Sequence, residues 1–112
     1  MSGRGKTPPN AVQNQFETGQ IVFSKRGRDA RLPFVVLRVE GEYLYLADGR
    51  LRPAARPKKK KIMHVQRTNF ISEEIRIKMQ TNEDGEKKRP LLDADIRRVL
   101  SAYVSAETKD DI

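Results

Sequence analysis

The sequence lacks several residue types that proteins use for chemistry: it has no cysteine, no tryptophan and a single histidine in 112 residues. Without cysteine the chain can form no disulfide, no thiolate metal site and no thiol nucleophile. Its apolar fraction of 37% is below the usual share of roughly 45 to 50%. No stretch approaches the about 20 apolar residues that a membrane helix needs, and the start of the chain lacks the apolar run of a secretory signal. We therefore expect one small, soluble, cytoplasmic domain with a modest core.

Groups that could carry catalysis are equally sparse. His64 is the only histidine, and no carboxylate lies at metal-ligand spacing from it, so we expect it to pack in the core or to contact a phosphate. Asp29 lies among arginines, which favours an ion pair within its loop over an acid catalyst. The chain has no nucleophile and base pair, metal cluster or phosphate-binding loop. The sequence predicts a protein that is not an enzyme and that holds no metal or cofactor.

The order of the elements predicts a mainly β fold followed by α structure. Residues 1–17 are rich in Gly, Pro and Asn and predict a flexible tail. In residues 18–69, short β-rich runs alternate with turn residues, which is typical of a small β-barrel. The expected strands are Ile21–Phe23, Pro33–Glu40, Tyr43–Ala47 and a last run formed by Ile62, Met63 and Val65. Residues 70–112 are expected to form a helical extension of one or two short helices.

The clearest local prediction is a hairpin. Gly41-Glu42 has the pattern of a tight two-residue turn between two alternating runs. The alternation places Val35, Leu37, Val39, Leu44 and Leu46 on apolar faces, and Tyr43 and Tyr45 on the outer face. Asp48-Gly49 signals a second turn, after which we expect residues 50–61 to connect strands outside the core, because they contain two prolines, seven bases and no acid.

Helical spacing appears only near the C-terminus. Asp93 is expected to cap a helix whose apolar face carries Ile96, Val99, Leu100, Tyr103 and Val104, with Asp95 in its first turn. Ser72 is expected to cap a shorter helix, Glu73–Met79, although residues 75–79 also alternate as a strand would. We favour the helix.

Basic charge is concentrated in the β segment. Residues 18–69 carry 13 Lys and Arg against four Asp and Glu, a net charge of +9, whereas residues 70–112 carry a net charge of −2. Charge confined to one small unit makes a directional field that attracts phosphate backbones. The bases form two clusters, one of Lys25, Arg26, Arg28 and Arg31 and one of Arg50, Arg52, Arg56, Lys58, Lys59, Lys60 and Lys61. We expect the two loops to lie at one end of the barrel and to contact one RNA backbone.

Two of these features have ordinary alternatives. A lysine run is commonly a solvated or disordered stretch, and it can also serve as a nuclear localisation patch. Tyr43 and Tyr45 could stack on bases, but tyrosine is also a common strand former.

The segment Gln20–Asp29, followed by the apolar strand Phe34–Leu37, resembles the KOW motif, which consists of a strand, a basic loop with a near-obligate glycine, and a second strand. With Leu46–Gly49 and the run Ile62–Val65, the segment is similar to the branch that contains a eukaryotic and archaeal large-subunit ribosomal protein and small stand-alone bacterial relatives. The resemblance covers residues 18–69. It implies an SH3-like barrel that binds structured RNA.

Individual residues of the loop also match the motif. Gly27 matches the motif glycine, and Lys25, Arg26 and Arg28 match the loop bases, which in the family commonly lie against RNA. Many members have a second glycine after the loop, where this chain has Ala30-Arg31-Leu32-Pro33.

Charge and resemblance lead to the same functional expectation. We expect a ribosome-associated RNA-binding protein, monomeric when free, that binds ribosomal RNA, acts in translation and also contacts ribosomal proteins. The alternative is a protein-interaction barrel that docks a partner of the transcription or translation machinery through its C-terminal helix or hairpin face. Binding to a membrane surface is less favoured, because the polar face of the helix from Asp93 mixes acids and bases.

Overall fold

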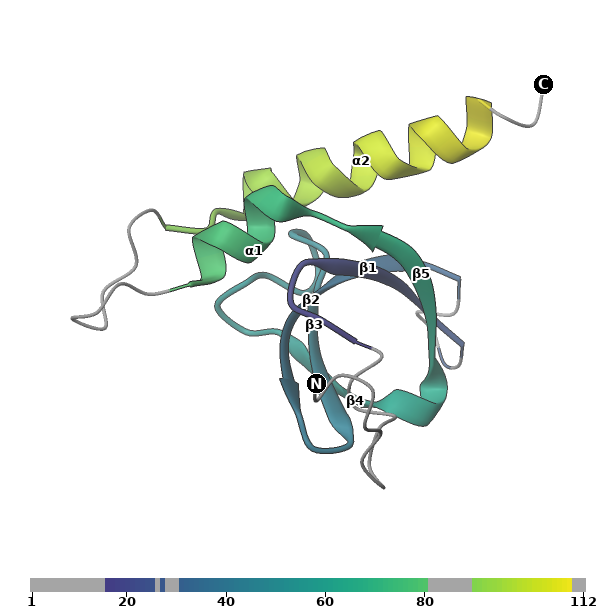
Figure 1. Ribbon diagram of the computed structural model, residues 1–112, viewed down its shortest axis with the longest axis vertical. Helices are drawn as coiled ribbons and strands as arrows, with labels where there is room; N and C mark the ends of the chain where they lie inside the picture. Colours follow the sequence, from purple (N-terminus) through teal and green to yellow (C-terminus); the bar gives the residue numbers. More distant parts are fainter. Residues whose placement is uncertain (1–15, 26, 28–30, 81–89, 110–112) are drawn as a thin grey trace, which may run out of the picture.

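A five-stranded antiparallel sheet and two helices make up the fold (Figure 1). The structure is a computed structural model and describes residues 16–25, 27, 31–80 and 90–109. The strands follow the order β4-β3-β2-β1-β5 across the sheet. Their bounds are β1 Gln20–Ser24, β2 Pro33–Glu40, β3 Tyr43–Ala47, β4 Lys58–Lys61 and β5 Val65–Ile71, and a 3-10 helix, η3 (Ile62–His64), joins β4 to β5. The helices are α1 (Glu73–Met79) and α2 (Asp93–Lys109). The prediction of a mainly β chain with C-terminal helices is therefore confirmed.

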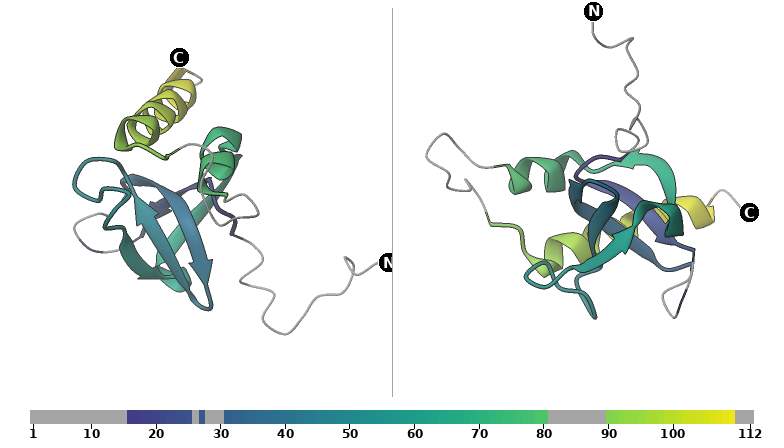
Figure 2. Two further views of the ribbon diagram at one scale, coloured as in Figure 1. Left: turned by 90° about the vertical axis from the view of Figure 1, so that its left-hand side faces the viewer. Right: turned by 90° about the horizontal axis from the view of Figure 1, so that it is seen from below.

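The sheet curves strongly (Figures 1 and 2), and each of its faces carries an apolar cluster. The concave face encloses one apolar cluster, formed by Phe16, Val22, Phe34, Val36, Leu44, Leu46 and Val65. The convex face packs against the two helices through a second cluster, formed by Ile21, Val35, Leu37, Ala47, Ile75, Ile96 and Leu100. Because β1 and β2 contribute to both clusters, they read as continuous apolar runs.

The predicted hairpin is confirmed in its bounds and its turn. Glu40 pairs with Tyr43 across the Gly41-Glu42 turn, and Gly41 has a φ of +61°. Leu44 and Leu46 are fully buried in the concave cluster, as expected. One detail is wrong: Val39 does not share a face with Val35 and Leu37. A register shift between Val36 and Arg38 adds a residue to β2, so Val39 packs against the concave cluster.

The segment after the second turn differs from the prediction. Its last four residues, Lys58–Lys61, form β4, which pairs with β3 from Tyr43↔Lys61 to Leu46↔Lys58. The predicted strand at Ile62, Met63 and Val65 is wrong, because Ile62–His64 form η3, and Val65 instead begins a seven-residue strand. Four lysines are tolerated in a strand because β4 lies at the edge of the sheet, where lysine opposes further strand pairing.

The loop after β1 takes left-handed backbone at two described positions. Gly27 has a φ of +81°, as its place in a tight loop predicts, and Arg31 has a φ of +71°. Arg31 occupies the loop exit, where its N–H donates to the Ser24 carbonyl at 2.8 Å. Among the described residues, Arg31 is the only one other than glycine with a positive φ.

Both predicted helices are present. The Ser72 hydroxyl accepts a hydrogen bond from the Ile75 N–H and caps α1, which decides the helix against the strand alternative. The predicted capping role of Asp93 is wrong. The Leu92 carbonyl accepts the first helical bond, from Ile96, and the Asp95 carboxylate reaches back to the Leu92 N–H at 3.0 Å. Asp93 instead accepts a bond from the Ala54 N–H at 2.7 Å.

Two of the expected segment boundaries can be compared with the structure. Of the expected tail, residues 1–15 lie outside the described residues, and Phe16 is buried in the concave cluster. Strand β5 continues across the expected boundary between residues 69 and 70 and ends at Ile71.

Candidate nucleic-acid interface

The outer side of β2, β3 and β4 carries cations and tyrosines next to one another. Arg38 pairs with Tyr45, which pairs with Lys59, and Tyr43 pairs with Lys61. Side chains alternate between the faces of a strand, and Leu44 and Leu46 face the concave core, so these five residues share the opposite face. We call them the basic–aromatic face: Arg38, Tyr43, Tyr45, Lys59 and Lys61.

Contacts within the face hold its cations over the rings. The Arg38 guanidinium carbon lies 4.3 Å from the centre of the Tyr45 ring, and the Lys59 Nζ lies 4.5 Å from the centre of the Tyr43 ring. The Tyr45 hydroxyl donates to Glu40 at 3.0 Å, and Glu40 lies 3.7 Å from Arg38. Glu40 is the only acid in the three strands. The face therefore keeps a net positive charge.

The loop between β3 and β4 is fixed in place by hydrogen bonds. The Asp48 carboxylate accepts bonds from the Arg50 and Arg52 N–H groups, both at 2.9 Å. Arg97 of α2 donates to the Gly49 carbonyl at 2.6 Å. With the Asp93 bond to Ala54, α2 thus holds the loop at two points. Arg50 and Arg56 are exposed on this loop, and Arg52 is half-buried.

The two predicted basic clusters leave the sheet at the same end. Val35 at the start of β2 pairs with Ala47 at the end of β3, so the loops before β2 and after β3 begin side by side. Leu32 and Pro33 of one segment and Arg50 and Leu51 of the other line one shallow hollow of about 450 Å³. The expected proximity of the two segments is therefore confirmed at their bases.

The members of each cluster are placed differently. Lys25, Gly27 and Arg31 are exposed on the loop after β1, whereas the predicted site residues Arg26 and Arg28, and also Asp29, lie outside the described residues. In the second cluster, Lys59 and Lys61 are exposed on the basic–aromatic face, and Lys58 and Lys60 are half-buried along β4. The lysine run thus points in two directions, and only alternate lysines join Arg38.

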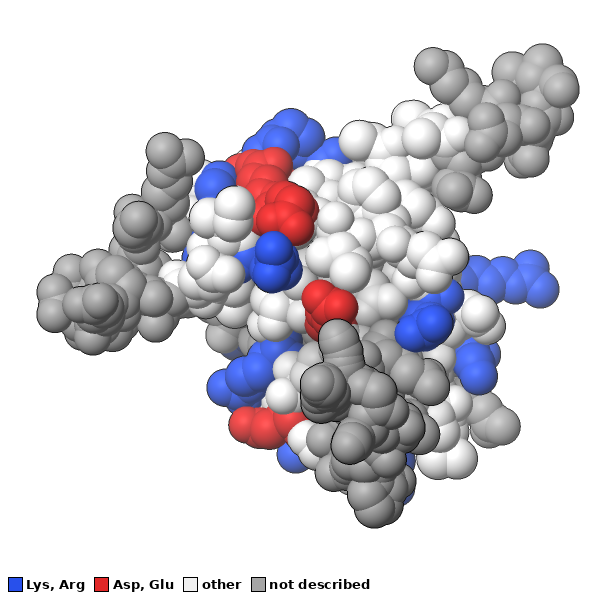
Figure 3. All heavy atoms as spheres, in the orientation of Figure 1, with Lys and Arg blue, Asp and Glu red and all other residues white. Residues whose placement is uncertain are grey.

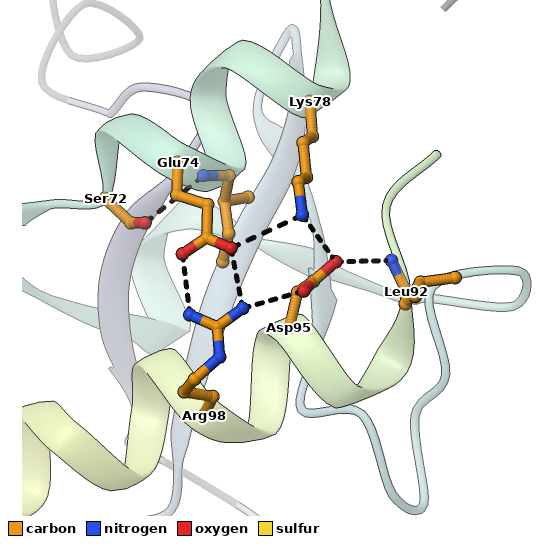
Figure 4. A network of polar contacts seen from close by, with 7 residues as sticks. Ser72, Glu74, Lys78, Leu92, Asp95 and Arg98 are labelled. Carbon is orange, nitrogen blue, oxygen red and sulfur yellow. Dashed lines mark hydrogen bonds and ion pairs between the residues drawn. The ribbon is translucent and has the colours of Figure 1, made fainter. Parts of the chain in front are cut away.

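Acidic groups gather in the helices instead. Figure 3 shows the largest acidic patch of the viewed side over α1 and the start of α2. There Arg98 binds Glu74 through two hydrogen bonds, at 2.8 and 2.7 Å, and contacts Asp95 at 2.8 Å (Figure 4). Lys78 lies 3.0 Å from Asp95 and 3.4 Å from Glu74. These four residues, Glu74, Lys78, Asp95 and Arg98, form what we call the helix clamp.

The contacts within the clamp favour the charged forms of Glu74, Asp95 and Arg98. The hydrogen bonds from Arg98 lower the pKa of Glu74, with Lys78 adding to the effect against the opposing effect of burial. The Leu92 N–H, followed by Lys78, lowers the pKa of Asp95. Bonding to Glu74 and the charge of Asp95 raise the pKa of Arg98. The acids of the clamp are therefore held ionised and paired.

Sequence reasoning did not include Arg38 in the candidate site. The signal was present, because a two-residue turn at Gly41-Glu42 fixes the register of the hairpin. Counting back from that turn places Arg38 directly opposite Tyr45, because the extra residue of β2 lies beyond this pair, between Val36 and Arg38. The extra residue is the part that alternation alone does not predict.

Comparison with known proteins adds no relative: no protein-family model matches the chain, and no curated protein matches it in sequence. Among the described residues, no group of three or more His, Asp or Glu side chains is placed to hold a metal ion. Within the same part of the chain, no helix combines the length and apolarity needed to cross a bilayer.

Proposed function

We propose that this protein is a non-catalytic RNA-binding protein of the KOW class, that its curved sheet is an SH3-like barrel, and that it binds the backbone of structured ribosomal RNA. The observation that carries the proposal is the basic–aromatic face. Three cations lie together on an exposed sheet surface, next to a basic loop that α2 holds in place. In support of the barrel, the two edge strands β4 and β5 are joined by only the three residues of η3.

The spacing of the lysines suits a phosphate backbone. Lys59 and Lys61 are two residues apart on one side of a strand, which separates them by about 6.8 Å along the strand. That distance is close to the separation of successive phosphates on one RNA strand. Each lysine can therefore contact one phosphate. Lysine acts as a point charge with little geometric demand. The proposed contact therefore follows backbone shape and is largely independent of base sequence.

The tyrosines support the face without being its main contact. A cation already covers each ring, and a base could stack there only after displacing it. Cation–π pairs contribute about 0.5 to 1 kcal/mol at exposed sites, so this displacement reduces the gain from stacking. Structured RNA is therefore favoured over single strands, which need open stacking platforms.

The decisive experiment removes the two lysine charges. We expect Lys59→Gln with Lys61→Gln to weaken binding to purified large-subunit ribosomal RNA. We also expect the slope of log affinity against log salt to fall by about 1.4 to 1.8, since each phosphate contact accounts for about 0.7 to 0.9. The matched control, Asn69→Asp with Ala94→Glu, lowers the net charge by the same two units at exposed positions of β5 and α2. An equal loss of affinity in both variants would leave only a general charge effect and refute the site.

The cellular assignment has its own test. Sedimentation of the native protein from its own cells at low and high salt should place it with large ribosomal subunits at low salt only. Migration at the top of the gradient under both conditions would reject association with the ribosome.

A further inference from the structure

A second surface, separate from the basic–aromatic face, lies beside α2. The hollow at the bases of the two basic loops has apolar walls formed by Leu32, Leu51, Leu100 and Val104, and Arg50 and Arg97 also line it. We call it the α2 hollow. It shares no residue with the basic–aromatic face. In Figure 1, α2 extends beyond the sheet towards its C-terminus.

The walls expose more apolar surface than the fold requires. Leu51 is 79% exposed, Leu32 44% and Val104 43%. Seven large apolar side chains are exposed in the described part of the chain, and three of them meet in this hollow. A group of exposed apolar side chains rimmed by polar ones is typical of an interaction site, whereas scattered ones need no explanation.

The exposure of Leu51 is a fixed feature. Its neighbours Arg50 and Arg52 both donate their N–H groups to Asp48. The Gly49 carbonyl is held by Arg97. The loop is therefore anchored on both sides of Leu51, and the leucine is held beside α2 with most of its surface in water.

Charge selects the kind of partner. Arg50 and Arg97 lie in the hollow, and its one acid, Asp48, already accepts two backbone hydrogen bonds. The hollow thus combines apolar walls with positive charge. RNA has no aliphatic side chains to fill such walls, and a second copy of this chain, with a net charge of +8, would be repelled.

We propose that the α2 hollow docks a segment of a partner protein that carries both apolar and acidic side chains. Its apolar side chains would cover Leu51, Leu32 and Val104, and its carboxylates would pair with Arg50 and Arg97. This inference does not depend on the proposed RNA contact.

The test uses the ¹⁵N-labelled full chain and two short synthetic peptides. Both have leucines at helical spacing; one carries glutamates on the remaining positions and its twin carries lysines. We expect the glutamate peptide to shift the amide resonances of Leu32, Leu51 and Val104, and the lysine twin to leave them unchanged. Leu51→Ser should lower the affinity for the glutamate peptide about tenfold, the factor that corresponds to about 1.4 kcal/mol. Met63→Ser is the matched control, since Met63 is 66% exposed in η3, outside the hollow.

Several results would overturn the proposal. One is an absence of shifts at the hollow; another is a set of shifts confined to the basic–aromatic face, which would mean attraction by charge alone. Equal affinity of Leu51→Ser and the unchanged chain would also refute it. Shifts at the hollow caused by ribosomal RNA but not by the peptide would assign it to nucleic acid. Concentration-dependent shifts without peptide would assign it to a second copy.

Discussion

Arg31 has an unfavourable backbone conformation at the exit of the loop after β1. Its φ of +71° lies in the left-handed region, which costs a non-glycine residue about 1 to 2 kcal/mol. Glycine would remove that cost. It would also make the unfolded chain more flexible, which lowers the stability by roughly 0.5 to 1 kcal/mol. We expect Arg31→Gly to raise the free energy of unfolding by up to about 1 kcal/mol. A β-branched Arg31→Val should lower it. Urea denaturation measures both.

The control for this prediction is Arg56→Gly. It removes the same charge from an exposed loop position where the backbone is not left-handed. That variant should be slightly destabilised. An equal change in the free energy of unfolding for Arg31→Gly and Arg56→Gly would show that the backbone at Arg31 is not strained.

Among the elements, α1 and α2 are joined by the helix clamp, and the clamp makes stability depend on pH. The pKa values of Glu74 and Asp95 are lowered in the folded chain from their ordinary values of 4.5 and 3.8. The stabilisation that these two ionised carboxylates give is therefore complete above about pH 4.5. It is lost as the pH falls through their lowered pKa values in the folded chain. Asp95→Asn should cost about 1 to 2 kcal/mol at pH 7 and flatten this acid dependence. Urea unfolding of the variant and of the unchanged chain at pH 7, 4 and 3 tests this prediction. If the free energy of unfolding fell equally with pH in both proteins, the prediction would be contradicted.

The elements also show where sequence reasoning succeeds. The bounds of β2 and β3 follow from alternation and a two-residue turn, both of which are local. β4 does not follow from its own residues, because four lysines have little strand preference. It forms because β3 offers an unpaired edge, which is a tertiary cause. The lysine charges of the candidate site were predicted from the sequence. The inclusion of Arg38 and the separation of Lys59 and Lys61 from Lys58 and Lys60 were not, because both depend on how the strands pair.

At the scale of the whole molecule, the concave cluster draws on a residue from outside the sheet. Phe16 precedes β1 and is 6% exposed among the side chains of the strands. We expect removal of residues 1–15 to leave the Tm almost unchanged, because their composition offers little to bury. Removal of one further residue, Phe16, should cost about 3 to 5 kcal/mol. Thermal unfolding of the two truncations compares them directly, and a large loss in the shorter deletion would show that residues 1–15 are part of the core.

The four lysines of β4 have a consequence that does not depend on any ligand. An edge strand presents unpaired backbone groups on which strands of other molecules can add, and such addition can continue into fibrils. Each copy that approached β4 would bring its own lysines against these, and the repulsion opposes growth. Replacing them with strand-forming apolar residues would strengthen the pairing of β4 with β3 and at the same time create a template for aggregation. The charge at this edge thus keeps the sheet at five strands.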